Sequence, residues 1–466
     1  MASRIGPLWT AIVLLAVFVR AAGVLLLQSH LVPRSTYEHG EIAANLIAGR
    51  GFSTRFLGAD GPTSQQAPVY PSIVAVAYLI GGVETPRSLL ILELGQAVLG
   101  GVLTLGVMVL ARRIAGDHPR AVLAAGLLAA LHPTLVYAAT HVQVALLGAT
   151  LVTWALASAL RLAETGRPRD AVTAGSLLAL TALTDPILGL VAAGMLVAVF
   201  LGRERAPALR LSALMLGVAA AGVSPWIARN ALVHGEFVAI KSTFGYAFWQ
   251  GNCAISEGTD KVVRASVETT LGGKTGETGL AAWNRTLWKA RHEAGYIDDI
   301  ALTNEDRSLL GRVTEPERSR ILLRRALADL RRQPWRYPQL CLRRLRYFWL
   351  FDETNPKARS MVYRASQCGL LALSLAGLAA CGRDVRRRLL PLLATTGLVA
   401  AFHALTIVSA RFHVPLEPLM AVIAGSGLAG ALPFGVPWGS AAAAHDVVGV
   451  GIVDGLERGG LLDGAA

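Results

Sequence analysis

Long apolar stretches divide this sequence into segments, several of which reach about 20 residues with few or no charges. That is the length a helix needs to cross the hydrocarbon core of a bilayer. Uninterrupted apolar runs of this length are typical of membrane helices and not of the core of a soluble domain. The pattern predicts about ten transmembrane helices, near residues 7–27, 88–110, 121–139, 143–161, 171–184, 186–202, 208–227, 361–382, 389–409 and 414–432.

One further apolar segment, 69–82, is too short to cross a bilayer comfortably. If it does not cross, the arginine-rich loops all fall on one side, and the opposite short loops, near 140–142 and at Asp185, carry no Lys or Arg. Because cytoplasmic loops are enriched in Lys and Arg, we predict that 69–82 lies on the outer surface. Both termini are then cytoplasmic, and 28–87 and 228–360 are outer loops. The inner arginines are Arg112, Arg113, Arg120, Arg161, Arg167, Arg169, Arg203, Arg205, Arg210, Arg383, Arg386, Arg387 and Arg388.

Composition agrees with a membrane protein. Of the 466 residues 53% are hydrophobic and only 16% are charged, whereas about 25% of residues are charged in soluble domains. The net charge of +13 is explained by membrane orientation better than by nucleic-acid binding, so we expect no nucleic-acid partner. We predict an all-α polytopic membrane protein with one transmembrane domain over 1–432. The Gly- and Ala-rich segment 433–466 is expected to be a poorly ordered cytoplasmic tail.

The first outer loop holds the acidic residues best placed for chemistry. Glu38 and Glu41 are three positions apart, so both can share one face of a short helix that Gly49 and Gly51 end. A carboxylate held at the membrane surface can act as a general base, although acidic residues on an outer loop are more often simply solvated. The four cysteines show no close-spaced pair, which argues against a zinc or redox motif. We assign no metal ligands, and a divalent metal stays open as a cofactor.

Short motifs occur in a fixed order along the chain. They are EHGEIA (38–43), NLIAGRGFS (45–53), GPT (61–63), APVYP (67–71), SPWIARN (224–230), KSTFGYAFWQGN (241–252), RRLRYFW (343–349) and RFHVPLEPL (411–419). Together they resemble the GT-C glycosyltransferases, and most of all the bacterial family-39-like branch related to protein O-mannosyltransferases and lipid A aminoarabinose transferases. The resemblance extends over roughly residues 5–430 and rests on the order of the motifs, since each alone is weak. The fold it implies is GT-C-like, with juxtamembrane helices in the first outer loop and a larger outer loop between spans seven and eight.

The resemblance implies a sugar donor carried on a polyprenyl phosphate and an acidic residue of the first loop as the base. We transfer the base to Glu38, with Glu41 as second candidate. Arginine and lysine suit the phosphate, so Arg411, Lys241 and Arg229 are the candidate phosphate-binding residues. Arg411 is the only cation in its outer hairpin, which is against the orientation rule. The alternative to a role in phosphate binding is an ion pair between Arg411 and Glu417.

These observations predict a membrane glycosyltransferase that transfers a hexosyl or pentosyl group, with inversion, on the outer face of a bacterial inner membrane. The expected partners are the lipid bilayer, a polyprenyl-phosphate sugar donor, and a lipid, glycan or protein acceptor. Two other interpretations stay open. A transporter or flippase of lipid-linked sugar would have a similar composition, although such proteins often contain paired repeats. An inactive family member is the other, since Ser35 stands near the place where many relatives carry Asp.

Overall fold

The computed structural model describes residues 2–33, 36–262, 270–271 and 279–430. The predicted cytoplasmic tail, 433–466, lies outside the described residues. Residues Met1–Pro433 form one compact unit. As predicted, most of the described chain is helical, and its strands are limited to two short antiparallel pairs within the loops.

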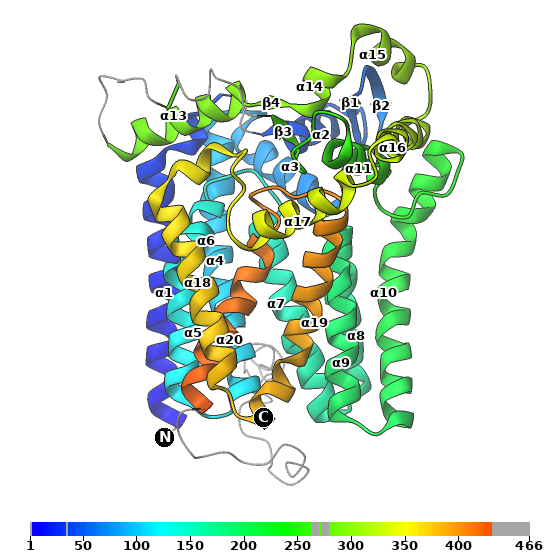
Figure 1. Cartoon of the computed structure of the whole chain (residues 1–466). Coiled ribbons are helices and arrows are strands. Elements are labelled where there is room, and N and C mark those ends of the chain that lie inside the picture. The colour runs from blue at the N-terminus through cyan, green and yellow to red at the C-terminus, as the bar shows by residue number, and fades with distance from the viewer. Residues whose placement is uncertain (1, 34–35, 263–269, 272–278, 431–466) are drawn as a thin grey trace, which may run out of the picture. The chain divides into compact units, whose positions relative to one another are not determined.

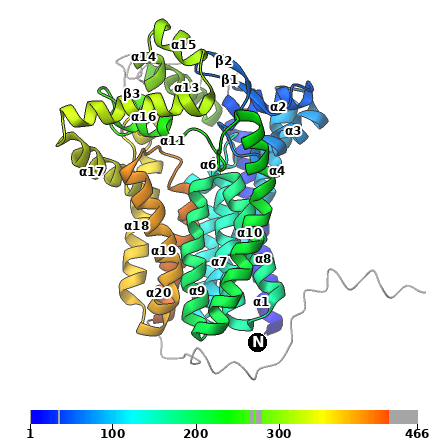
Figure 2. The same ribbon diagram turned by 90° about the vertical axis from the view of Figure 1, so that its right-hand side faces the viewer.

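Long helices run side by side and form a bundle (Figures 1 and 2). One apolar core joins most of them, and small residues allow close approach, as at Gly175, where an added Cβ would lie 2.4 Å from the carbonyl oxygen of Met215. The bundle consists of α1 (Ala2–Leu27), α4 (Pro86–Ala115), α5 (Pro119–Leu131), α6 (Pro133–Ala138), α7 (Ala145–Thr165), α8 (Pro168–Thr184), η2 (Pro186–Leu190), α9 (Val191–Gly202), α10 (Arg205–His234), α18 (Met361–Ala380), α19 (Arg383–Leu405) and α20 (Glu417–Gly430).

Among the described residues, five segments are helical, long and apolar enough to cross a membrane. Shorter apolar helices occur at Val69–Gly81, Pro119–Leu131, Pro186–Gly202 and Val414–Leu428. All ten predicted spans fall largely within helices of the bundle, but a count of ten crossings stays a prediction. The five long segments are Gly6–Leu31, Pro86–Ala115, Ala145–Thr165, Arg205–His234 and Arg383–Leu405.

Two helix boundaries differ from the sequence prediction for local reasons. The span expected over 121–139 breaks at His132, whose ψ of 119° is extended, because a residue that precedes proline avoids the helical region. Helix α10 continues past the expected end at residue 227 as far as His234. Gly235, with φ of 69°, then ends it in the left-handed conformation that glycine adopts without strain.

The remaining elements gather at one end of the bundle (Figure 1). Helices α2 and α3 belong to the first loop and pack against each other, and Figure 2 shows them beside α4 at this end. The elements are η1 (Ser29–Leu31), α2 (Tyr37–Ile47), β1 (Ser53–Phe56), β2 (Ala59–Pro62), α3 (Val69–Gly81), α11 (Phe244–Asn252), β3 (Lys261–Val262), α13 (Leu280–Glu293), β4 (Gly295–Tyr296), α14 (Ile297–Ala301), α15 (Asn304–Gly311), α16 (Glu315–Arg332), α17 (Arg336–Trp349), η3 (Pro356–Arg359) and η4 (Val414–Leu416).

Helix α3, which covers most of 69–82, spans 13 residues, or about 20 Å at 1.5 Å per residue. This is shorter than the roughly 30 Å hydrocarbon core of a bilayer. One face packs inward through Tyr70 and Tyr78, whereas Leu79 and Ile80 are 69% and 59% exposed. An exposed apolar face of this kind suits a helix that rests in the membrane surface.

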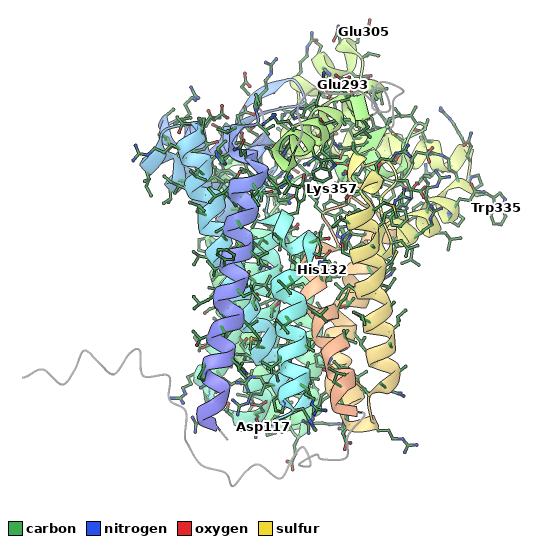
Figure 3. The ribbon with its side chains drawn as sticks, turned by 90° about the vertical axis from the view of Figure 1, so that its left-hand side faces the viewer. Asp117, His132, Glu293, Glu305, Trp335 and Lys357 are labelled. Carbon is green, nitrogen blue, oxygen red and sulfur yellow. The ribbon has the colours of Figure 1, made fainter. Side chains whose placement is uncertain are left out.

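The arginine-rich connections lie at the opposite end of the bundle from the loop elements. The start of α1 and the end of α20 are at that same end (Figure 1). Figure 3 shows Asp117, in the connection between α4 and α5, far from Glu293 and Glu305 in the large loop. The described chain therefore has its short arginine-rich connections and its candidate site at opposite ends of the bundle (Figure 1).

Candidate functional site

Glu38 lies in the first turn of α2, where the partial positive charge of a helix N-terminus stabilises a carboxylate. Its Oε1 accepts a hydrogen bond of 2.7 Å from Nε2 of Gln66. Burial raises the pKa of the Glu38 carboxyl, but the nearby His39, Arg411 and Lys241 lower it, and the net pKa is below the ordinary value. Glu38 is therefore ionised at neutral pH.

Lys241 lies on the other side of the same glutamine. Its Nζ donates a hydrogen bond of 3.0 Å to Oε1 of Gln66. A carboxylate only accepts and an ammonium only donates. The amide nitrogen of Gln66 therefore points to Glu38, and its amide oxygen points to Lys241. Burial and Arg411 lower the pKa of Lys241, Asp185 and Glu38 raise it, and the net pKa is below the ordinary value.

Arg411 lies in the connection between α19 and α20, shortly before η4. Burial lowers the pKa of its guanidinium, but the charges of Asp260 and Glu38 raise it, and the net pKa is above the ordinary value. Arg411 forms no ion pair with Glu417, which instead lies 3.3 Å from Nδ1 of His132 and 3.2 Å from Nε2 of His413. The Glu417 carboxylate is thus engaged by the two histidines and not by Arg411.

The structure therefore brings together three of the five candidate residues, Glu38, Lys241 and Arg411, from three distant segments of the chain. Their charges are close enough to shift one another's pKa. The arrangement places one carboxylate next to two cations at the loop end of the bundle. Such a group can hold an anion and accept a proton beside it.

Arg229 and Glu41 lie in different surroundings and contact the β1–β2 hairpin. The Arg229 guanidinium donates to the carbonyl oxygens of Phe52, at 2.9 Å, and Thr63, at 2.6 Å. Oε1 of Glu41 accepts a hydrogen bond of 2.7 Å from the backbone N–H of Arg55. These contacts position the first loop. Within the described residues, no hydrogen bond joins Arg229 or Glu41 to the cluster of Glu38, Lys241 and Arg411.

A stretch of the chain from the end of the first loop to α10 matches a known family. Residues 65–228 match the family model of the dolichyl-phosphate-mannose-protein mannosyltransferases. Together with the apolar helices, this match supports a membrane-bound glycosyltransferase and confirms the resemblance to the GT-C superfamily that the motifs predicted. The matched region includes Gln66 and most of α10, and it ends before Lys241 and Arg411. It also begins after Glu38.

The solved structures to which the chain is similar share little sequence with it, and their TM-scores are below 0.5. The archaeal oligosaccharyltransferase AglB from Archaeoglobus fulgidus, in complex with an inhibitory peptide and a dolichol-phosphate, has a TM-score of 0.49 and 16% identity. The match covers 90% of this chain and 50% of AglB, so the chain spans half the length of that enzyme. ArnT from Cupriavidus metallidurans, bound to undecaprenyl phosphate, has a TM-score of 0.42 and 16% identity over 92% of this chain and 78% of ArnT. No curated protein matches the sequence.

The sequence alone did not point to several residues of the site. Gln66 joins Glu38 to Lys241, yet an amide in a polar loop carries no distinctive signal. Asp260 shifts the pKa of Arg411, but it lies in a mixed-composition loop far from that residue in sequence.

A cavity next to Arg411 extends the site. Its lining consists of Tyr37, Gln143, Asp260, Lys261, Arg291, Tyr296, Asn355, Lys357, Ser409, Ala410 and Arg411. Within the described part of the chain, no group of three or more His, Cys, Asp or Glu side chains is arranged to hold a metal ion. The cations of the cavity and the Glu38 carboxylate suit recognition of an anion and transfer of a proton.

Proposed function

We propose that this protein transfers a sugar from a polyprenyl-phosphate donor to an acceptor hydroxyl on the outer face of a bacterial inner membrane. The observation that carries the proposal is the hydrogen-bonded link from Glu38 through Gln66 to Lys241 at the loop end of an apolar bundle, with Arg411 near enough for its charge to act on both groups. The match to dolichyl-phosphate-mannose-protein mannosyltransferases supports a lipid-phosphate donor. The arginine-rich connections at the opposite end support an outward-facing site.

In this proposal Lys241 and Arg411 hold the donor phosphate and stabilise the charge that develops on it as the leaving group. The isoprenoid tail stays in the bilayer. Glu38 accepts the proton of the acceptor hydroxyl, whose oxygen forms a bond to the anomeric carbon opposite the phosphate. The bond between that carbon and the phosphate oxygen breaks, and its electron pair leaves with polyprenyl phosphate. Attack from the opposite face inverts the anomeric centre.

Donor binding would also adjust the base. In the free protein the positive charges of Arg411 and Lys241 lower the pKa of Glu38, which keeps it ionised but makes it a weak base. A bound phosphate offsets these charges, so the pKa of Glu38 rises when the donor is in place. The carboxylate thus gains basicity at the step that needs it, which discourages proton transfer before the donor has bound.

The test uses the purified full chain and a panel of polyprenyl-phosphate sugars. Donor binding is measured beside the release of polyprenyl phosphate, because turnover also requires an acceptor. We expect Arg411→Gln to weaken donor binding by about tenfold or more, since a hydrogen bond to a charged group contributes about 1.5–3 kcal/mol. Arg55→Gln is the matched control, because the Arg55 side chain is exposed on the first loop and should change binding less than about twofold. The proposal is overturned if the wild type binds no donor in the panel, or if Arg411→Gln binds the donor as tightly as the wild type does.

A further inference from the structure

A second group of cations lies beside Arg411. Of the eleven residues that line the cavity, four are cationic and one, Asp260, is acidic. Neither Glu38 nor Lys241 is among the lining residues. The cations come from four separate segments, namely Lys261 in β3, Arg291 in α13, Lys357 in η3 and Arg411 before η4.

Arg291 is buried with part of its hydrogen-bonding capacity unused. Its side chain is 9% exposed, and its guanidinium stacks over the Trp288 ring at 4.4 Å. Within the described residues, its Nε and Nη1 have no hydrogen-bond partner. A buried guanidinium donor without a partner costs free energy, so these two N–H groups are suited to an anionic acceptor.

Lys357 and Lys261 are buried to a similar degree, at 8% and 3% exposed. The ammonium of Lys357 lies over the Tyr137 ring at 4.6 Å, and that of Lys261 lies over the Tyr296 ring at the same distance and donates to the Arg291 carbonyl. Figure 3 shows Lys357 above His132, toward the loop end of the bundle. In the part of the chain that is described, none of the four lining cations forms an ion pair with a carboxylate.

Mutual repulsion and burial disfavour the charged forms of the two lysines. Burial, followed by the charge of Arg291, lowers the pKa of Lys357 to about 7. The same causes lower the pKa of Lys261 to about 8. An anion in the cavity would stabilise both protonated forms and relieve the repulsion.

We propose that this cavity binds an anionic group of a substrate, a phosphate or a carboxylate, separate from the phosphate that links the donor sugar to its lipid. The inference rests on the proposed function. A sugar joined to a polyprenol through phosphate is a phosphodiester with a single negative charge, which Lys241 and Arg411 suffice to bind. If the donor sugar is neutral, the donor supplies no further negative charge to pair with Arg291, Lys261 and Lys357. The second anion belongs either to the donor sugar or to the acceptor.

The experiment measures binding of inorganic phosphate and of glucuronate to the full chain saturated with polyprenyl phosphate. We expect both probes to bind in the presence of the lipid, and Arg291→Gln and Lys357→Gln each to weaken that binding about tenfold or more. Lys289→Gln is the matched control, since Lys289 is exposed on the same helix as Arg291 and should leave the affinity within about twofold. Arg291→Lys keeps the charge and should retain part of the affinity, which separates loss of the charge from loss of the fold.

Two donors distinguish the sources of the anion. If polyprenyl-phosphate glucuronic acid binds more tightly than polyprenyl-phosphate glucose, and Arg291→Gln removes the difference, the anion belongs to the donor sugar. If the two bind alike and glucuronate still binds beside each of them, it belongs to the acceptor. Probes that do not bind, or that only compete with the lipid, overturn the inference and leave the proposed function standing. The proposed function fails separately, if Lys241→Gln and Arg411→Gln both bind polyprenyl phosphate as the wild type does.

Discussion

The substitution Glu38→Gln tests the base most directly, because it changes the charge and little else. Glutamine has the shape of glutamate, and its amide oxygen can still accept the 2.7 Å hydrogen bond from Nε2 of Gln66. The variant should therefore fold normally and keep Lys241 in place through Gln66. What it loses is the negative charge and the ability to accept the acceptor's proton.

The expected effect is on turnover and not on donor binding. A positioned general base contributes about 10²–10⁴-fold to the rate, which corresponds to roughly 3–5 kcal/mol of barrier. Donor binding should be unchanged or slightly tighter, because the substitution removes a negative charge from the neighbourhood of Lys241 and Arg411, where we propose that the phosphate binds. The assay follows release of polyprenyl phosphate under single-turnover conditions, beside equilibrium binding of the donor.

Glu41→Gln is the matched control on the same helix. It removes the same charge three positions along, and its amide oxygen can still accept from the Arg55 N–H, as Oε1 of Glu41 does. We expect a change in turnover of less than about threefold. The reasoning is refuted if Glu38→Gln keeps wild-type turnover. It is also refuted if Glu41→Gln lowers turnover as much as Glu38→Gln does, because the role of Glu38 would then not be specific.

Three further predictions concern binding, pH and packing. Lys241→Gln should raise the Kd of polyprenyl phosphate about tenfold, whereas Arg229→Gln should mainly lower the midpoint of thermal unfolding, because it removes the guanidinium hydrogen bonds to the Phe52 and Thr63 carbonyls. Equal effects of the two substitutions on Kd would contradict this division. Glucuronate affinity should fall as the pH rises from 6 to 8.5, because the pKa of Lys357 is about 7 and its charge is lost above that pH. Binding titrations across this pH range should show a smaller loss of affinity in Lys357→Arg, and an unaltered loss would exclude Lys357 as the cause. Gly251→Ala should lower stability by about 1–3 kcal/mol, since an added Cβ would lie 2.2 Å from a backbone oxygen. Gly217→Ala, inside α10 and with no atom within 4 Å of the added Cβ, should raise stability by up to about 1 kcal/mol in the same unfolding assay, because alanine favours the helix over glycine.

Much of the fold could be predicted because the signals are local. Each predicted span depends on a run of apolar residues, and the break at His132 follows from the proline next to it. The site was predicted only in part. The motifs singled out Glu38, Lys241 and Arg411 one by one, and only the structure shows that Gln66 joins the first two; their roles stay predictions. Arg229 was expected at the phosphate as well, whereas its described hydrogen bonds run to the first loop.

The sequence by itself determined the class of protein, the succession of helices and the family resemblance. These properties depend on the length of apolar runs, on proline and glycine next to helix ends, and on short motifs, all of which act between neighbouring residues. The tertiary structure alone decided which charges meet. Glu38 and Arg411 lie near opposite ends of the chain, and the cations of the cavity come from four separate segments. Their electrostatic interaction depends on distance through space, which the helix packing determines and residue spacing along the chain does not.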